Sequence, residues 1–171
     1  MKRILITGIS GTGKSTVVAA LAQRGYAAVD ADLPEYSEVV SVDEDELTGL
    51  GSGKDWVWRA DRIRALLDAN DAPLLFLSGT SPNQGEFYDQ LDAIILLTAP
   101  PDAIVQRLAT RTTNPFGKRP DEVARVLALQ ESIEPLLREG ATHVIDTRLP
   151  LAQVVDRILD IADGVRVTGD R

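Results

Sequence analysis

The chain has 171 residues, of which 44% are hydrophobic and 26% charged, as is typical of one globular domain with a sizeable core. Its net charge of −8 disfavours general nucleic-acid binding and attachment to a membrane through a basic surface. The absence of cysteine excludes disulfides and thiolate chemistry, and no apolar run reaches membrane-spanning length. We recognise no signal peptide, because a glycine-rich segment interrupts the first apolar run at once.

Apolar runs alternate with helical patterns along the chain. This alternation predicts a single α/β domain over 1–171, with a parallel sheet covered by helices on both faces. Strands are expected at 3–7, 26–30, 74–77, 93–97 and 143–146. Helices are expected at 14–24, 55–69, 84–91, 101–110, 121–139 and 151–162.

Glycine and proline residues and the segments between these elements give further expectations. Gly25 is placed to end the first helix, and Pro135 predicts a kink or break in the long helix, which Gly140 should end. The segments 33–54 and 111–120 are expected to be irregular and mobile. The tail from residue 164 onward is expected to be frayed.

The strongest motif lies at residues 8–16, Gly-Ile-Ser-Gly-Thr-Gly-Lys-Ser-Thr. This is the G-x-x-x-x-G-K-S pattern of a phosphate-binding loop, in the expected context between a strand and a helix. Its glycines let backbone N–H groups surround an anion, its lysine reaches the outer phosphates, and its serine hydroxyl can ligate Mg²⁺. We therefore expect a nucleotide to be bound by Gly8, Gly11, Thr12, Gly13, Lys14, Ser15 and Thr16.

Two carboxylates, Asp30 and Asp32, end the second predicted strand. Ligands of open α/β sheets bind outside the carboxyl ends of the strands, where the glycine loop also lies. We expect Asp30 to act near Mg²⁺ and Asp32 near a substrate hydroxyl, although a solvated turn would also contain aspartates. The third strand ends in Ser-Gly-Thr instead of the second acid found in many P-loop proteins, which strengthens Asp30 as the metal ligand. Gly79 and Thr80 either bind substrate there or form an ordinary turn.

Three further groups of residues are candidates for binding. Arg59 follows two tryptophans at an expected helix start, where it would hold an anion or simply be solvated, and the acidic run 43–46 is expected to be solvated. A basic flap over the phosphates is predicted around 111–120, with Arg111 as its first cation and Lys118 and Arg119 close behind. Arg107 flanks that flap, Arg148 is placed to stack on a nucleotide base, and the single histidine, His143, is expected to be structural.

With these residues in place, the chain resembles the nucleoside-monophosphate-kinase-like P-loop family, and its layout is most similar to shikimate kinase. The resemblance rests on the glycine loop, the Asp-x-Asp, the Trp58-Arg59 pair, and the segments 134–138 and 145–147. It implies a five-stranded parallel sheet of order 2-3-1-4-5, a substrate-binding region at 33–62, a short lid at 111–120, and ATP with Mg²⁺. It also implies that Asp30 lies on the Mg²⁺ side and that Asp32 contacts the acceptor hydroxyl.

The chain departs from shikimate kinases at three places. It has Ser78-Gly79-Thr80 instead of three glycines, Ile133 instead of a carboxylate-binding arginine, and its own lid sequence. Losing one charged clamp from a carboxylate site typically costs a few kcal/mol, which argues against shikimate as the acceptor.

From the sequence we expect a cytoplasmic, ATP- and Mg²⁺-dependent kinase of a small molecule, with Lys14, Asp32 and Arg111 as its catalytic residues. A hydroxyl acceptor is slightly favoured, and a nucleoside monophosphate is the alternative acceptor. A non-catalytic ATP-binding module remains a third possibility, while a GTPase is disfavoured because no guanine-binding Asn-Lys-x-Asp motif is present.

Overall fold

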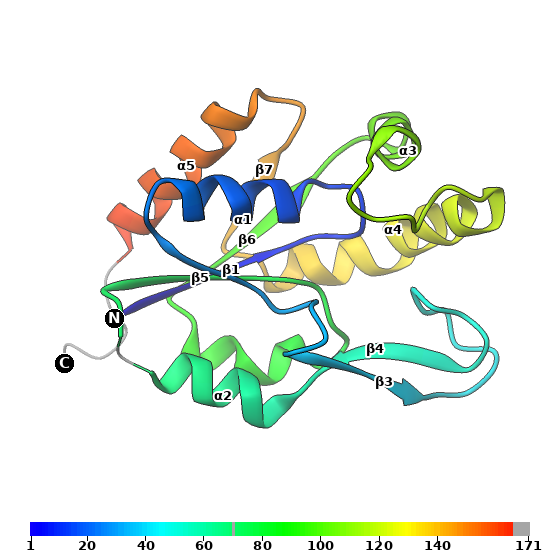
Figure 1. The fold of residues 1–171 in the computed structure, drawn as a ribbon, viewed down its shortest axis with the longest axis horizontal. Coiled ribbons are helices and arrows are strands. Elements are labelled where there is room, and N and C mark those ends of the chain that lie inside the picture. Colours follow the sequence, from blue (N-terminus) through cyan, green and yellow to red (C-terminus); the bar gives the residue numbers. More distant parts are fainter. Residues whose placement is uncertain (70, 166–171) are drawn as a thin grey trace.

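The computed structural model describes residues 1–69 and 71–165. Its centre is a parallel sheet of five strands, in the spatial order β2-β5-β1-β6-β7 (Figure 1). The strands are β1 (Lys2–Thr7), β2 (Ala27–Asp30), β5 (Leu74–Ser78), β6 (Ala93–Thr98) and β7 (His143–Asp146). Numbered among themselves, they follow the predicted order 2-3-1-4-5, so the expected P-loop architecture is confirmed.

Helices cover both faces of this sheet, because its strands alternate apolar side chains between the two faces. On one face, Ile4 and Ile6 of β1 pack with α1 (Lys14–Gln23) and α5 (Leu151–Gly164). On the other face, Leu5 packs with α2 (Ala60–Asp68) and the 3₁₀ helix η1 (Gln84–Gln90). A third apolar cluster joins α3 (Pro101–Thr110) and α4 (Pro120–Gly140) to β6.

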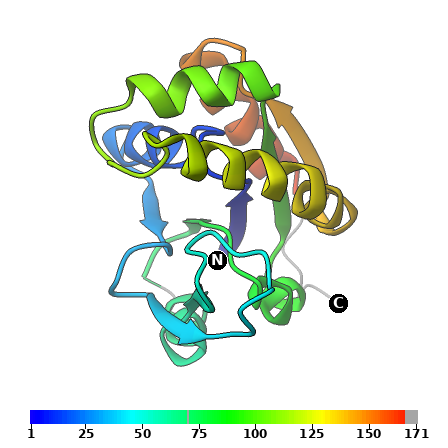
Figure 2. The same ribbon diagram turned by 90° about the vertical axis from the view of Figure 1, so that its right-hand side faces the viewer.

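A β-hairpin occupies the region that we expected to be irregular. Strands β3 (Ser37–Ser41) and β4 (Lys54–Trp58) pair antiparallel, and α2 begins only at Ala60, so the prediction of a helix from residue 55 was wrong. The physical reason is that the two tryptophans are spaced two residues apart, which is the repeat of a strand and not of a helix. Trp56 and Trp58 therefore lie on one face of β4, and Trp58 is 2% exposed in the core beneath α2. Seen from the carboxyl ends of the sheet, α3 and α4 lie on one side and this hairpin on the other (Figure 2).

Two of the helix-end expectations can be compared with the structure. Gly25 adopts a φ of 86°, and the N–H groups of Gly25 and Tyr26 donate to the carbonyls of Ala22 and Leu21, which confirms the predicted glycine end. The break expected at Pro135 is absent, since α4 runs from Pro120 to Gly140 without interruption. The carbonyl left without a donor belongs to the exposed Glu131, where water can satisfy it.

The expected frayed tail begins within α5 at Gly164, and its last residues, 166–171, lie outside the described part of the chain. None of the helices in the described part combines the length and hydropathy needed to cross a bilayer.

Candidate functional site

The glycine loop connects β1 to α1 at the carboxyl edge of the sheet. A Cβ on Gly8 would lie 2.5 Å from the Leu97 carbonyl oxygen, so only glycine fits against β6 there. Gly13 has a φ of 102°, and a Cβ on it would meet no atom within 4 Å. The Thr12 hydroxyl is buried and closes the loop by donating to the Ile9 carbonyl at 2.8 Å. The loop is therefore formed, with open space beside its last glycine, as a bound phosphate requires.

Lys14 contacts this loop and interacts with Asp30, the last residue of β2, and with Asp32, which follows it. Its Nζ donates to the carbonyls of Gly8 and Ile9. Burial lowers the pKa of Lys14, while the charges of Asp32 and Asp30 act in the opposite direction. The charges of both carboxylates thus favour the charged form of Lys14.

Oxygen atoms of Ser15, in the first turn of α1, and of Asp30, at the end of β2, lie side by side. The Ser15 hydroxyl lies 3.4 Å from Asp30 Oδ2, and Asp30 Oδ1 accepts the backbone N–H of Asp32 at 3.0 Å. Hydroxyl and carboxylate oxygens are the ligands that Mg²⁺ prefers, with waters and substrate phosphates completing its shell. These two residues fit such an ion.

Asp32 is held by donors from two other elements. Its Oδ1 accepts the indole N–H of Trp58 at 3.2 Å and the backbone N–H of Thr80 at 3.1 Å. Burial raises the pKa of Asp32, while Lys14 and these hydrogen bonds oppose the rise. A Cβ on Gly79 would lie 2.6 Å from Oδ1, so Gly79 leaves room for this carboxylate. The Trp56 indole fixes the same residue by donating to its carbonyl at 2.8 Å.

The basic residues of the predicted flap separate into three environments. Arg111 Nη1 lies 3.4 Å from the Ser10 hydroxyl of the glycine loop, and its charge contributes to the lowered pKa of Lys14. Burial also lowers the pKa of Arg111, and its Nε is buried without a hydrogen-bond partner among the described residues. Lys118 Nζ instead donates to carbonyls at the end of α3, and the exposed Arg119 pairs with Asp121 at 2.9 Å. Only Arg111 of these three cations contacts the loop.

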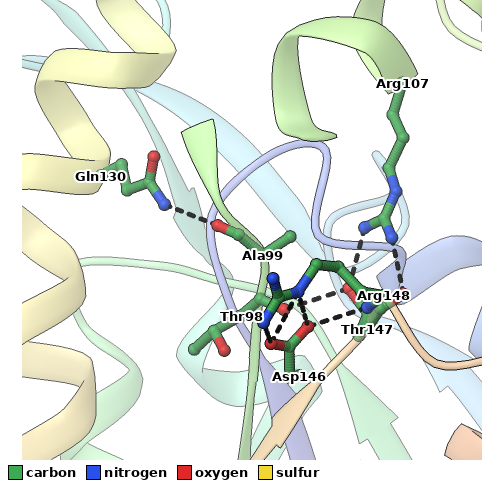
Figure 3. Close-up of polar contacts among 7 residues, drawn as sticks. All are labelled: Thr98, Ala99, Arg107, Gln130, Asp146, Thr147 and Arg148. Carbon is green, nitrogen blue, oxygen red and sulfur yellow. Dashed lines mark hydrogen bonds and ion pairs between the residues drawn. The ribbon is translucent and has the colours of Figure 1, made fainter. Parts of the chain in front are cut away.

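Arg107 reaches from α3 to the turn after β7 (Figure 3). Its guanidinium donates to the hydroxyl of Thr147 at 2.8 Å and to its carbonyl at 2.6 Å, and lies 3.3 Å from the Gly11 carbonyl. The Thr147 hydroxyl in turn donates to the Thr12 carbonyl at 2.8 Å. Arg107 therefore holds the glycine loop in place through hydrogen bonds to Thr147 and to the loop itself. Nothing in the sequence indicated this role.

Arg148 and Arg59 are each paired with an acid outside the group around Asp32. Arg148 pairs with Asp146 at 2.6 Å and is largely exposed, and this hydrogen-bonded pair lowers the pKa of Asp146 (Figure 3). Arg59 pairs with Glu38 at 3.2 Å. Arg59 directly follows β4, and its partner Glu38 is opposite Val57 in the hairpin, on the face away from Trp56 and Trp58.

Two of the remaining sequence expectations fall outside the site. His143 is exposed at the start of β7, at the opposite edge of the sheet from the loop. Residues 43–46 are exposed, as expected for a solvated acidic run. The sequence analysis missed Trp56 and Trp58 as partners of Asp32, and the signal available for them was their spacing of two residues on a strand.

The sequence model of the AAA domain family matches residues 4–128. This chain belongs to the AAA domain family. Among curated relatives of this AAA domain, a nucleotide-binding protein of Cupriavidus taiwanensis is 34% identical over 164 residues, which cover 86% of this chain and 50% of the relative. Shikimate kinase 2 of Yersinia enterocolitica is 30% identical over 171 residues, which cover 92% of this chain and 94% of the relative.

A solved structure agrees with this assignment. The shikimate kinase from Acinetobacter baumannii in complex with shikimate has a TM-score of 0.63 and 18% identity, and the match covers 97% of this chain and 96% of that one. The predicted resemblance to P-loop small-molecule kinases is thereby confirmed at the level of family and fold. This AAA domain spans about half the length of several curated relatives that it matches.

Proposed function

We propose that this AAA-domain protein transfers the γ-phosphoryl group of ATP to a small-molecule acceptor, with Mg²⁺ as cofactor and a hydroxyl compound as the preferred acceptor. The observation that carries the proposal is the placement of Asp32, a half-buried carboxylate that Trp58 and Thr80 hold beside the phosphate-binding loop, with Thr80 also bonded to Gly8. Binding a nucleotide requires the loop and its lysine, whereas an acid held in this place can orient an acceptor hydroxyl.

Each residue then has a defined task. The loop amides and Lys14 bind the β- and γ-phosphates, and Arg107 with Thr147 keeps the loop in shape. Ser15 and Asp30 would hold Mg²⁺, and the ion would neutralise charge on the phosphates. Arg111 moves its guanidinium from the Ser10 hydroxyl to the transferring group.

Asp32 serves the acceptor. The acceptor oxygen forms a bond to the γ-phosphorus as the bond from that phosphorus to the β,γ-bridging oxygen breaks and ADP leaves. The hydroxyl proton passes to Asp32 Oδ2. This oxygen has spare accepting capacity, because its one hydrogen bond within residues 1–69 and 71–165 comes from the Thr80 N–H at 3.2 Å, which Oδ1 shares. Such transfers need little help from a base, so orienting the hydroxyl is the larger contribution of Asp32.

The environment of Arg59 favours a neutral hydroxyl acceptor over a nucleoside monophosphate. An anionic acceptor would need an unpaired cation on the Asp32 side of the hairpin, whereas Arg59 is paired with Glu38 on the other side. Arg148 is proposed to stack on the nucleotide base, where its partly exposed pair with Asp146 leaves a guanidinium face available.

The test is ADP release from Mg²⁺-ATP in the presence of a panel of sugars, polyols, nucleosides and nucleoside monophosphates. We expect a neutral hydroxyl compound to accelerate ADP release well above the rate without acceptor. Acceleration by nucleoside monophosphates alone would replace our acceptor with the alternative one. Tight ATP binding without acceleration by any compound would favour a binding module, in line with the names of the nucleotide-binding relatives.

A further inference from the structure

Thr80 lies at the end of β5 and contacts both halves of the proposed site. Its hydroxyl donates to the Gly8 carbonyl at 2.6 Å and accepts the Gly8 N–H at 3.1 Å. Both backbone groups of the first residue of the phosphate-binding loop are thus bound by one side chain. From the sequence, Gly79 and Thr80 were expected either to bind substrate or to form an ordinary turn.

The backbone N–H of Thr80 holds Asp32, the acid on the acceptor side of the proposed site. The Thr80 N–H donates to Asp32, at 3.1 Å from Oδ1 and 3.2 Å from Oδ2. The preceding residue, Gly79, donates to the Ile6 carbonyl of β1 at 3.1 Å, so this turn is attached to the sheet as well. Thr80 is therefore a direct link between the loop and Asp32.

The Thr80 hydroxyl has little capacity left for a ligand. Its single proton is directed to the Gly8 carbonyl, and its oxygen also lies 3.1 Å from the Thr7 hydroxyl. Thr7 in turn donates to Gln84 at 3.2 Å, and Gln84 is 3% exposed. An acceptor hydroxyl would have to displace these partners, which would leave polar groups around Gly8 unsatisfied.

We propose that Thr80 is a positioning residue, which fixes the phosphate-binding loop relative to Asp32 and does not bind the acceptor. The inference rests on the proposed function, because it assigns the two groups to the two sides of one transfer reaction. Reacting atoms must approach within about 3 to 3.5 Å in line, so a small displacement of either group slows the reaction.

The two possible roles of Thr80 give opposite kinetic patterns. If Thr80 holds the loop, removing its hydroxyl weakens ATP binding and lowers kcat, while KM for the acceptor stays nearly unchanged. If Thr80 binds the acceptor, the same change raises the acceptor KM and leaves ATP affinity alone. A serine at this position retains the hydroxyl and should rescue in either case, so it reports on the hydroxyl itself.

The experiment compares Thr80→Val and Thr80→Ser in the whole chain, with Thr80→Ala as a second variant should valine prevent folding. The Kd for Mg²⁺-ATP is measured without any acceptor, so this readout does not depend on whether the acceptor is known. We expect Kd to rise about tenfold for Thr80→Val and Thr80→Ala, and less than about twofold for Thr80→Ser.

Thr142→Val is the matched control. The Thr142 hydroxyl also bonds both backbone groups of one residue, the N–H of Ile94 at 2.9 Å and its carbonyl at 3.0 Å, but at the opposite edge of the sheet. It should leave the Kd for ATP unchanged.

A second readout follows Asp32. The chain has two tryptophans, and both indoles donate to Asp32. Trp56 donates to the backbone carbonyl, whereas Trp58 donates to the carboxylate. The indole N–H signal of Trp58 in NMR spectra therefore reports on this carboxylate. That signal should shift in Thr80→Val and keep its wild-type position in Thr80→Ser and Thr142→Val.

An unchanged ATP Kd in both Thr80→Val and Thr80→Ala would overturn the proposal, as would a rise in the acceptor KM with ATP affinity intact. If instead no compound accepts phosphate from the wild-type protein while the ATP Kd still responds to Thr80, the kinase assignment fails and the link between Thr80 and the loop stands.

Discussion

The chemical task proposed for Asp32 goes with an unfavourable environment. The carboxylate is half-buried, and removal from water is the largest cause of its raised pKa. The indole of Trp58 and the amide of Thr80 stabilise its charged form only in part. The protein thus keeps an acid near Lys14 at a cost in stability, as is common for groups that perform chemistry.

The pH dependence of stability should reveal this cost. A carboxyl whose pKa is higher in the folded state than in the unfolded state binds its proton more tightly when folded, so it loses stabilisation as pH rises through the folded pKa. An asparagine at position 32 does not titrate. The difference in Tm between Asp32→Asn and wild type should therefore become more favourable to the variant as the pH rises above about 4, the usual pKa of an aspartate. A difference that stays constant over this range would contradict the raised pKa.

The three flap cations should differ in their effects on turnover. Of these three, only Arg111 contacts the phosphate-binding loop, so Arg111→Gln should lower kcat by about 10²- to 10³-fold. Arg119→Gln should change kcat by less than about threefold, because Arg119 forms an exposed pair with Asp121. Arg24→Gln is the control for net charge. Arg24 is an exposed cation at the C-terminal end of α1, away from the loop, and is paired with Asp156. Equal losses for Arg111→Gln and Arg119→Gln would contradict this assignment.

At the scale of elements, the β3–β4 hairpin was the part of the fold that sequence analysis could not find. Its strands are five residues each, with polar and apolar residues in equal number, and are separated by a loop rich in glycine and acidic residues. Their pairing depends on register between distant segments, which no local pattern encodes. The five sheet strands could be predicted because each is a short apolar run bounded by glycine, proline or a helix.

The segment after α3 is fixed to that helix at Gly117. Its φ is 86°, and a Cβ there would lie 2.8 Å from Leu108 Cδ2, a core side chain with 0% exposure. Gly117→Ala should therefore cost about 2 to 3 kcal/mol, combining backbone strain with overpacking, and lower Tm by about 5 to 10 °C.

Gly85→Ala is the control for this substitution, since Gly85 has no positive φ and a Cβ there would meet nothing within 4 Å. If both variants melted at the wild-type temperature, the tight contact between the segment and α3 would be disproved.

At the scale of the whole molecule, the parallel sheet brings the parts of the site to one edge. β1 delivers the phosphate-binding loop, β2 delivers Asp30 and Asp32, and β5 delivers Thr80 between them in the strand order. This convergence could be predicted from sequence, because strand ends and their polar residues are local features. The partners of Asp32 and of Arg107 could not, because Trp58, Thr80 and Thr147 reach them only through tertiary packing.

The central claim is that the loop and the two acids form one phosphoryl-transfer centre. The most direct measurement follows label from γ-labelled ATP into a small-molecule product, for the wild type and for Lys14→Met and Asp32→Asn. We predict labelled product with the wild type, none with Lys14→Met, and a rate at least about 10²-fold lower with Asp32→Asn, whose ATP affinity should stay close to that of the wild type. Transfer at the wild-type rate by Asp32→Asn would contradict the account.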